Sequence, residues 1–142
     1  MRTAGKIWTL LGLSLLLLLQ AGCRGKAKAE DWIPEKNRNL VSATAYLNER
    51  CPEMVDSDTR LDSVFLSQEG HLSFFYTLPG RESTSISSTA FYAYMMPEII
   101  DNVRTNRDLK MHRDSSLTMV FNYSDRNGVQ ITRLILEPDK YK

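Results

Sequence analysis

Two cysteines, Cys23 and Cys51, are the residues of this 142-residue sequence with the greatest capacity for covalent chemistry. A catalytic thiolate needs a neighbouring base and electropositive surroundings. The sequence has only two histidines, His71 and His112, and the spacing of neither favours such a pair. Cys51 instead continues an apolar stripe that begins at Leu40, which predicts a buried structural thiol. An envelope enzyme that uses Cys51 is the alternative.

The acidic loop that follows Cys51 contains Glu53, Asp56, Asp58 and Asp62. Alternating carboxylates can bind Ca²⁺, but a calcium-binding loop of the EF-hand type needs Gly at its sixth position and Glu at its twelfth. Counted from Asp56, those positions hold Leu61 and Ser67. We therefore expect a solvated loop without a metal. Since the sequence also lacks a phosphate-binding glycine loop and a nucleophile elbow, we expect no cofactor and no catalytic residue.

The first 22 residues have the pattern of an export signal. Arg2 and Lys6 precede an almost wholly apolar stretch, residues 7–19, and small residues follow at Ala21 and Gly22. That order is typical of a secretory signal peptide. The apolar stretch is shorter than the roughly 20 residues that a membrane-spanning helix needs. An uncleaved anchor is therefore the weaker interpretation.

The segment Ala21-Gly22-Cys23 resembles the lipobox of bacterial lipoproteins. The resemblance implies a signal peptide over residues 1–22, cleavage before Cys23 and a lipid on the Cys23 thiol. Residues 23–31 would then form the lipid-bearing tether, and the membrane would be a partner. Cleavage after Ala29, at an A-x-A site, is the rival and would give a soluble secreted protein.

Charge and length limit what the rest of the chain can be. The formal net charge is +1, whereas nucleic-acid binders carry a clearly basic face, so we expect no nucleic-acid partner. Residues 32–142 are enough for one domain. Two cysteines exclude a scaffold built on several disulfides.

Hydrophobic periodicity predicts two helices and four strands. The helices are expected over residues 34–50 and 88–104, with Pro97 kinking or splitting the second and Tyr92 on its apolar stripe. Strands are expected over 61–67, 71–78, 117–123 and 129–136, and residues 105–115 as a charged connector. The two hairpins turn at Gly70 and at Asn127-Gly128.

This order, α-β-β-α-β-β, predicts an α+β fold with two helices packed on a four-stranded antiparallel sheet. The opposite face of the sheet would carry Phe75 and Val120, with Val64 or Leu66 nearby. Such a half-apolar face is a possible partner surface. The alternative is that the segment around Trp32 and Ile33 folds over it.

Residues 48–63 and 98–114 are similar to segments of small, uncharacterised exported bacterial proteins. That resemblance implies a bacterial cell-envelope location and leaves the activity open. We therefore predict a lipid-anchored, non-catalytic envelope protein that binds an envelope protein partner or helps to assemble one. A small envelope enzyme using Cys51 and a soluble secreted carrier are the alternatives.

Overall fold

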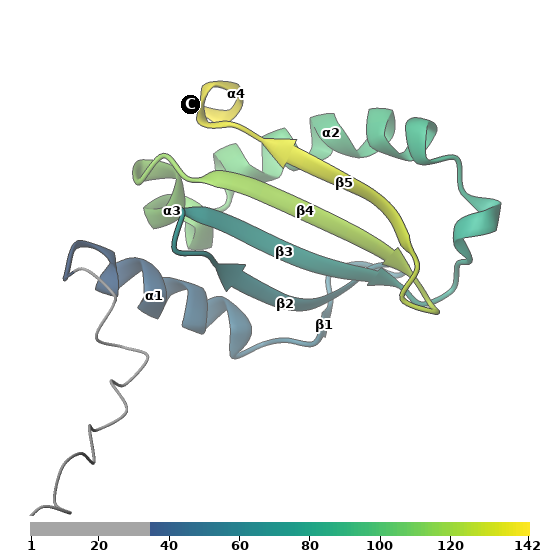
Figure 1. The fold of residues 1–142 in the computed structure, drawn as a ribbon, viewed down its shortest axis with the longest axis horizontal. Coiled ribbons are helices and arrows are strands. Elements are labelled where there is room, and N and C mark those ends of the chain that lie inside the picture. Colours follow the sequence, from purple (N-terminus) through teal and green to yellow (C-terminus); the bar gives the residue numbers. More distant parts are fainter. Residues whose placement is uncertain (1–34) are drawn as a thin grey trace, which may run out of the picture. The chain divides into compact units, whose positions relative to one another are not determined.

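The computed structural model describes residues 35–142, and the predicted signal peptide, Cys23 and the tether lie outside them. No helix within residues 35–142 is long and apolar enough to span a bilayer. Four α-helices, two 3₁₀ turns and five strands follow one another along this part of the chain (Figure 1). They are α1 (Glu35–Asn48), β1 (Glu53–Met54), β2 (Arg60–Leu66), β3 (His71–Leu78), η2 (Ser83–Ser85), α2 (Ser88–Thr105), η3 (Arg107–Leu109), α3 (Lys110–Asp114), β4 (Thr118–Asp125), β5 (Gln130–Leu136) and α4 (Pro138–Tyr141).

The sheet is five-stranded and mixed, in the order β1-β2-β3-β4-β5. The α+β class is confirmed, whereas the prediction of four antiparallel strands is wrong because β1 adds an edge strand and β3 pairs with β4 in parallel. The parallel pairing follows from the connection, since α2 has 18 residues and is therefore about 27 Å long. A helix of that length returns the chain to the end of the sheet where β3 began, so β4 starts in the same direction.

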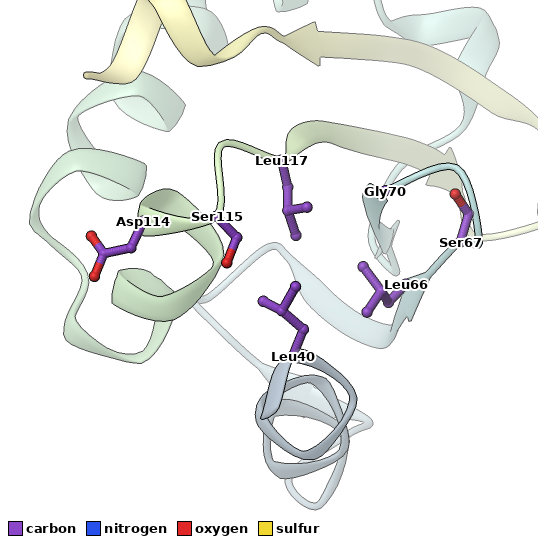
Figure 2. Close-up of a pocket in the computed structure, with 7 residues that line it drawn as sticks. All are labelled: Leu40, Leu66, Ser67, Gly70, Asp114, Ser115 and Leu117. Atoms are coloured by element: carbon purple, nitrogen blue, oxygen red, sulfur yellow. The ribbon is translucent and has the colours of Figure 1, made fainter. Parts of the chain in front are cut away.

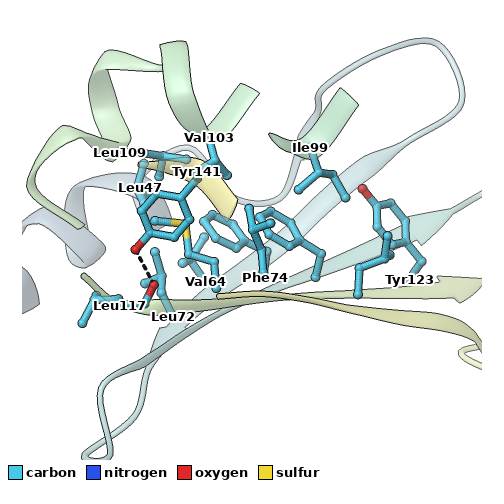
Figure 3. Packing of buried hydrophobic residues seen from close by; sticks show 14 of the residues in the cluster. Leu47, Val64, Leu72, Phe74, Ile99, Val103, Leu109, Leu117, Tyr123 and Tyr141 are labelled. Carbon is cyan, nitrogen blue, oxygen red and sulfur yellow. Dashed lines mark hydrogen bonds between the residues drawn. The ribbon is translucent and has the colours of Figure 1, made fainter. Parts of the chain in front are cut away.

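One hydrophobic core fills the space between the helices and one face of the sheet. Figure 3 shows Leu47, Ile99, Val103 and other helical residues on the same side of the strands as Phe74. Alternation along β3 and β4 directs every second side chain into this core. Its fully buried members include Leu72, Val103, Met119, Leu134 and Leu136.

Helix α1 lies against β2 and is fixed there by its last residue. The Asn48 side chain accepts a hydrogen bond from the Val64 backbone N–H (2.8 Å) and donates one to the Val64 carbonyl (2.6 Å). Leu40 and Leu47 are buried, as their spacing predicts, and Thr44 lies between them with 6 % of its surface exposed. Val64 is therefore a core residue and not part of the opposite face.

Helix α2 is a single helix from Ser88 to Thr105 that includes Pro97, so the predicted split does not occur. Phe91 packs on the core, and Tyr92, which we expected on the buried stripe, is 43 % exposed. The segment after α2 is not a simple connector. Its turns η3 and α3 bury Leu109 and His112, and the Arg113 guanidinium donates to the Val103 carbonyl (2.6 Å) near the end of α2.

Candidate functional site: a groove between α1 and α2

A groove of about 600 Å³ lies over the middle of the sheet. It exists because the two long helices pack over different strands, α1 over β2 and α2 over β5. The two central strands, β3 and β4, are thus left without a long helix directly above them. Both helices and four strands, β1 to β4, contribute side chains to the groove.

The floor of the groove consists of two stacked aromatic pairs. The parallel register places Phe74 opposite Phe121 and Tyr76 opposite Tyr123. In each pair the ring centroids are 4.9 Å apart, and the planes of the rings are nearly parallel. Pairs of this kind contribute about 1 kcal/mol beyond their buried area. The floor is therefore a stable apolar platform.

The wall formed by α2 is polar. Its groove-lining residues follow helical spacing, because Met95, Glu98, Asn102 and Thr105 are three or four positions apart and Asp101 lies beside them. The opposite wall comes from the end of α1 and from the acidic loop. Its residues are Leu47, Arg50, Glu53, Met54, Val55, Asp56 and Thr59.

Carboxylates outnumber cations around the groove. Among residues 35–142, Arg50 is the one basic residue that lines the groove, against five acidic residues: Glu53, Asp56, Glu98, Asp101 and Asp108. Arg50 already forms an ion pair with Asp108 (2.9 Å) and lies 4.0 Å from the Glu53 carboxylate. The groove therefore has a negative rim.

The phenols in the floor remain protonated. Burial is the first cause that raises the pKa of Tyr76 and of Tyr123 above the usual tyrosine value. Both hydroxyl groups are thus neutral at physiological pH and can donate hydrogen bonds. The floor adds no charge to the groove.

Among residues 35–142, those that line the groove include no histidine, cysteine, serine or lysine, but they include five carboxylates, two tyrosines and two threonines. Carboxylates and phenols can act as general acids or bases. An apolar floor with a polar rim is also the usual arrangement of a binding surface.

Cys51 lies just outside the groove, after the end of α1. Its side chain is partly exposed rather than fully buried as predicted, and its Sγ is 3.5 Å from the Leu47 carbonyl. Burial raises the pKa of the thiol, and the Glu53 carboxylate adds to that effect. A raised pKa makes a thiol a slow nucleophile at neutral pH.

The two histidines lie in different environments. His71 is exposed at the start of β3, and His112 is completely buried. The His112 Nε2 lies 3.1 Å from the Thr44 hydroxyl, which itself donates to the Leu40 carbonyl. That oxygen can therefore accept a hydrogen bond from Nε2–H, which ties α3 to α1. Burial lowers the pKa of the His112 imidazole and so favours its neutral form.

Two carboxylates of the acidic loop accept hydrogen bonds from protein donors. Asp62 accepts from the Arg60 guanidinium (2.5 Å) and from the Thr77 hydroxyl (2.6 Å), and Asp56 accepts from the Asp58 backbone N–H (2.7 Å). Within residues 35–142 no three His, Cys, Asp or Glu side chains are grouped as a metal site would need. The loop contributes Asp56 to the groove wall instead.

A smaller pocket of about 460 Å³ lies near the start of α1, beside the β2–β3 turn (Figure 2). Leu40, Leu66 and Leu117 give it an apolar side. Two of its polar groups are already engaged, because the Asp114 carboxylate pairs with Lys110 (2.5 Å) and the Ser67 hydroxyl accepts from the His71 N–H (3.2 Å). Leu66 thus lies on the helix side, not near the predicted partner face.

Phe75 and Val120 share the sheet face that points away from the helices. Phe75 is 41 % exposed, whereas Val120 is only 2 % exposed between its sheet neighbours Ser73 and Ile135. Two further apolar side chains, Phe65 and Ile135, are exposed on β2 and β5. Trp32 and Ile33, the alternative cover for this face, lie outside the described residues.

The sequence analysis did not predict the groove, and there is a physical reason for this. The alternation of β3 and β4 does predict that Phe74, Tyr76, Phe121 and Tyr123 share one face. Nothing local in the sequence shows that the helices above this face stand apart. One signal was present, since Glu98, Asn102 and Thr105 form a polar stripe beside the buried positions Ile99 and Val103.

Residues 35–132 match a protein family described as a domain of unknown function, DUF8479. No curated protein matches the chain. Two solved structures are similar. One is a Pseudomonas aeruginosa protein inferred to be secreted, with a TM-score of 0.58, 8 % identity and coverage of 78 % of this chain and 99 % of that one. The other is the pilotin EpsS of the Vibrio vulnificus type 2 secretion system, with a TM-score of 0.57, 12 % identity and coverage of 76 % and 96 %. At these identities the likeness shows the fold.

Proposed function

Because the chain belongs to this family of unknown function, its role has to be argued from its own residues, and we propose that it is a lipid-anchored, non-catalytic binding module of the bacterial cell envelope. In this proposal residues 1–22 are the signal peptide, Cys23 carries the lipid and residues 23–31 are the tether. Residues 32–142 are a single domain, whose groove between α1 and α2 holds a segment of an envelope protein.

The observation that carries the proposal is the composition of the groove. The exposed Met54 and Val55 and the partly exposed Tyr76 offer apolar surface to a ligand, and five carboxylates surround them. The fold shared with a secretion-system pilotin fits a role in envelope assembly, and the fold shared with a protein inferred to be secreted fits export. The likeness to the lipobox around Cys23 supports anchoring.

The face that carries Phe75 and Val120 is a second candidate contact surface. The exposed side chains Phe65, Phe75 and Ile135 support it, because exposed apolar residues on neighbouring strands favour protein contact. Both hollows described above lie on the helix side of the sheet, so we place the main partner in the groove.

Co-purification from solubilised membranes tests this assignment. Asn102 is an exposed residue of the groove wall, and Asn102→Trp would fill the groove without disturbing the core. Glu69→Trp, in the exposed β2–β3 turn, is the matched control. We expect proteins recovered with the wild type to be lost with Asn102→Trp and kept with Glu69→Trp. Equal recovery with all three would contradict the proposal.

A further inference from the structure

Given that the groove holds a partner, as proposed above, we infer that its occupant is an amphipathic helix of another protein with Lys or Arg along one flank. Three features of the groove lead to this: the charge of the α2 wall, the engagement of Arg50 and the position of the groove over the face of the sheet.

The α2 wall presents two carboxylates to the groove. Glu98 and Asp101 are both exposed and lie on the stripe that lines it. Neither takes part in any of the ion pairs found among residues 35–142. A cationic side chain of an occupant would meet both carboxylates without displacing an existing partner.

The opposite wall cannot attract an acidic occupant. Its only cation, Arg50, is bound by Asp108 at 2.9 Å, lies 4.0 Å from Glu53 and also lies over the Tyr46 ring. Asp56 adds a further carboxylate on this side. An occupant with phosphates or carboxylates would be repelled from both walls, which excludes nucleic acid and anionic lipid as the ligand.

The backbone N–H and C=O groups of the occupant need hydrogen-bond partners, and this requirement favours a helix. The groove lies over the face of β3 and β4, whose backbone groups are already paired within the sheet. The edge strand β1 reaches the groove wall but is only two residues long, so an extended occupant would find few N–H and C=O groups with which to pair, whereas a helix satisfies its own internally. Apolar side chains at i, i+3, i+4 and i+7 would meet the exposed Met54 and Val55 and the partly exposed Tyr76, as in other helix-in-groove complexes.

Two matched peptides test the charge of the occupant. Both are about 18 residues long with the same leucine stripe, which gives about five helical turns, and their polar positions carry Lys in one and Glu in the other. Binding is measured to the full chain in nanodiscs of a zwitterionic phospholipid, and empty discs correct for peptide bound to lipid. We expect the Lys peptide to bind about tenfold more tightly than the Glu peptide, with the difference shrinking as salt is raised.

Charge reversal in the groove supplies the control. The double variant Glu98→Lys/Asp101→Lys is expected to reverse the preference, whereas Glu69→Lys in the β2–β3 turn is expected to leave it unchanged. Asn102→Trp is expected to weaken both peptides. Thermal unfolding of each variant confirms that a loss of binding is not a loss of folding.

The outcomes separate this inference from the proposed function. If both peptides bind equally and Asn102→Trp blocks both, the groove binds helices but the basic flank is wrong. If neither peptide binds, or Asn102→Trp has no effect, the groove assignment fails as well. If replacing Arg24, Lys26 and Lys28 by Ser raises the affinity for the Lys peptide, the chain's own tether competes for the groove and the assignment to another protein is wrong.

Discussion

At the scale of single residues, the buried His112 makes the stability of the domain depend on pH. Burial lowers the pKa of its imidazole below the ordinary 6.5, with a smaller opposing effect from the Asp108 backbone. The unfolded chain therefore binds a proton at a higher pH than the folded one. The contribution of His112 to stability is present above pH 6.5 and is lost as the pH falls below that value.

The variant His112→Gln keeps a donor for the Thr44 hydroxyl and removes the titration. We expect it to cost about 1 kcal/mol at pH 7.5, typical of a buried polar substitution, and to flatten the pH dependence. Thermal unfolding between about pH 7.5 and about pH 5.5 measures both effects. If the wild type and the variant lose the same stability over this range, His112 is not responsible.

Asp125 makes the stability of the domain depend on pH in the same direction as His112, but over a lower pH range. Its carboxylate accepts from the backbone N–H groups of Ser83 (2.8 Å), Asn127 (2.8 Å) and Val129 (2.9 Å). These bonds, that of Ser83 first, lower the pKa of Asp125 to about 2 from 3.8. Its contribution is therefore complete above pH 3.8 and is lost as the pH falls towards 2.

We expect Asp125→Asn to destabilise the domain at neutral pH, because a carboxamide has only one acceptor oxygen for three donors. The variant should also lose less stability than the wild type on acidification from about pH 5 to about pH 2. Urea denaturation at several pH values provides the comparison. Parallel pH profiles for the two proteins would show that the turn does not depend on the charge.

At the scale of the elements, strand periodicity separates neighbouring residues of β3. Phe74 is 4 % exposed and stacks on Phe121, whereas Phe75 is 41 % exposed on the opposite face. Phe74→Ala is expected to cost about 3–5 kcal/mol, because it removes a buried aromatic ring and leaves a cavity. Phe75→Ala should cost less than about 1 kcal/mol. Denaturant titrations of both variants decide this, and equal losses would mean that the alternation is misassigned.

The elements were more predictable from the sequence than their pairing. The strand over His71–Leu78 and the turns at Gly70 and Gly128, both with positive φ, are confirmed because periodicity and turn chemistry are local. The β3–β4 pairing depends on the path of the whole α2 crossover, which no local pattern contains. The short strand β1 and the buried Leu109 and His112 sit in polar, charged sequence, so hydrophobicity gave no sign of them.

The site was less predictable than the elements for the same reason. The alternation of side chains along β3 and β4 predicts the floor of the groove. The groove itself depends on the distance between α1 and α2 on the sheet. Cys51 illustrates the limit, because its place after Leu47 predicted full burial whereas the thiol is partly exposed just beyond the end of α1. The burial of a residue at the end of a helix depends on how the next segment of the chain folds back over it. The spacing of apolar residues within the helix does not contain that information.

At the scale of the whole molecule, the proposal joins a membrane anchor to a binding groove. Cys23→Ser removes the thiol that would carry lipid, and stable anchoring needs more than one acyl chain. We expect the variant to leave the membrane fraction or to accumulate as an uncut precursor. Fractionation and the molecular mass of the mature protein measure this. A Ser variant that is processed and fractionates as the wild type does would contradict lipidation.

Photo-crosslinking in living cells tests the central claim most directly. A photoreactive phenylalanine analogue is placed at Asn102, on the groove wall, and in a matched strain at Glu69, in the β2–β3 turn. The account predicts an adduct from position 102 alone, with the crosslinked peptide mapping to one amphipathic segment of an envelope protein. Adducts of equal yield and identity from both positions, or none from position 102 in a folded protein, would contradict it.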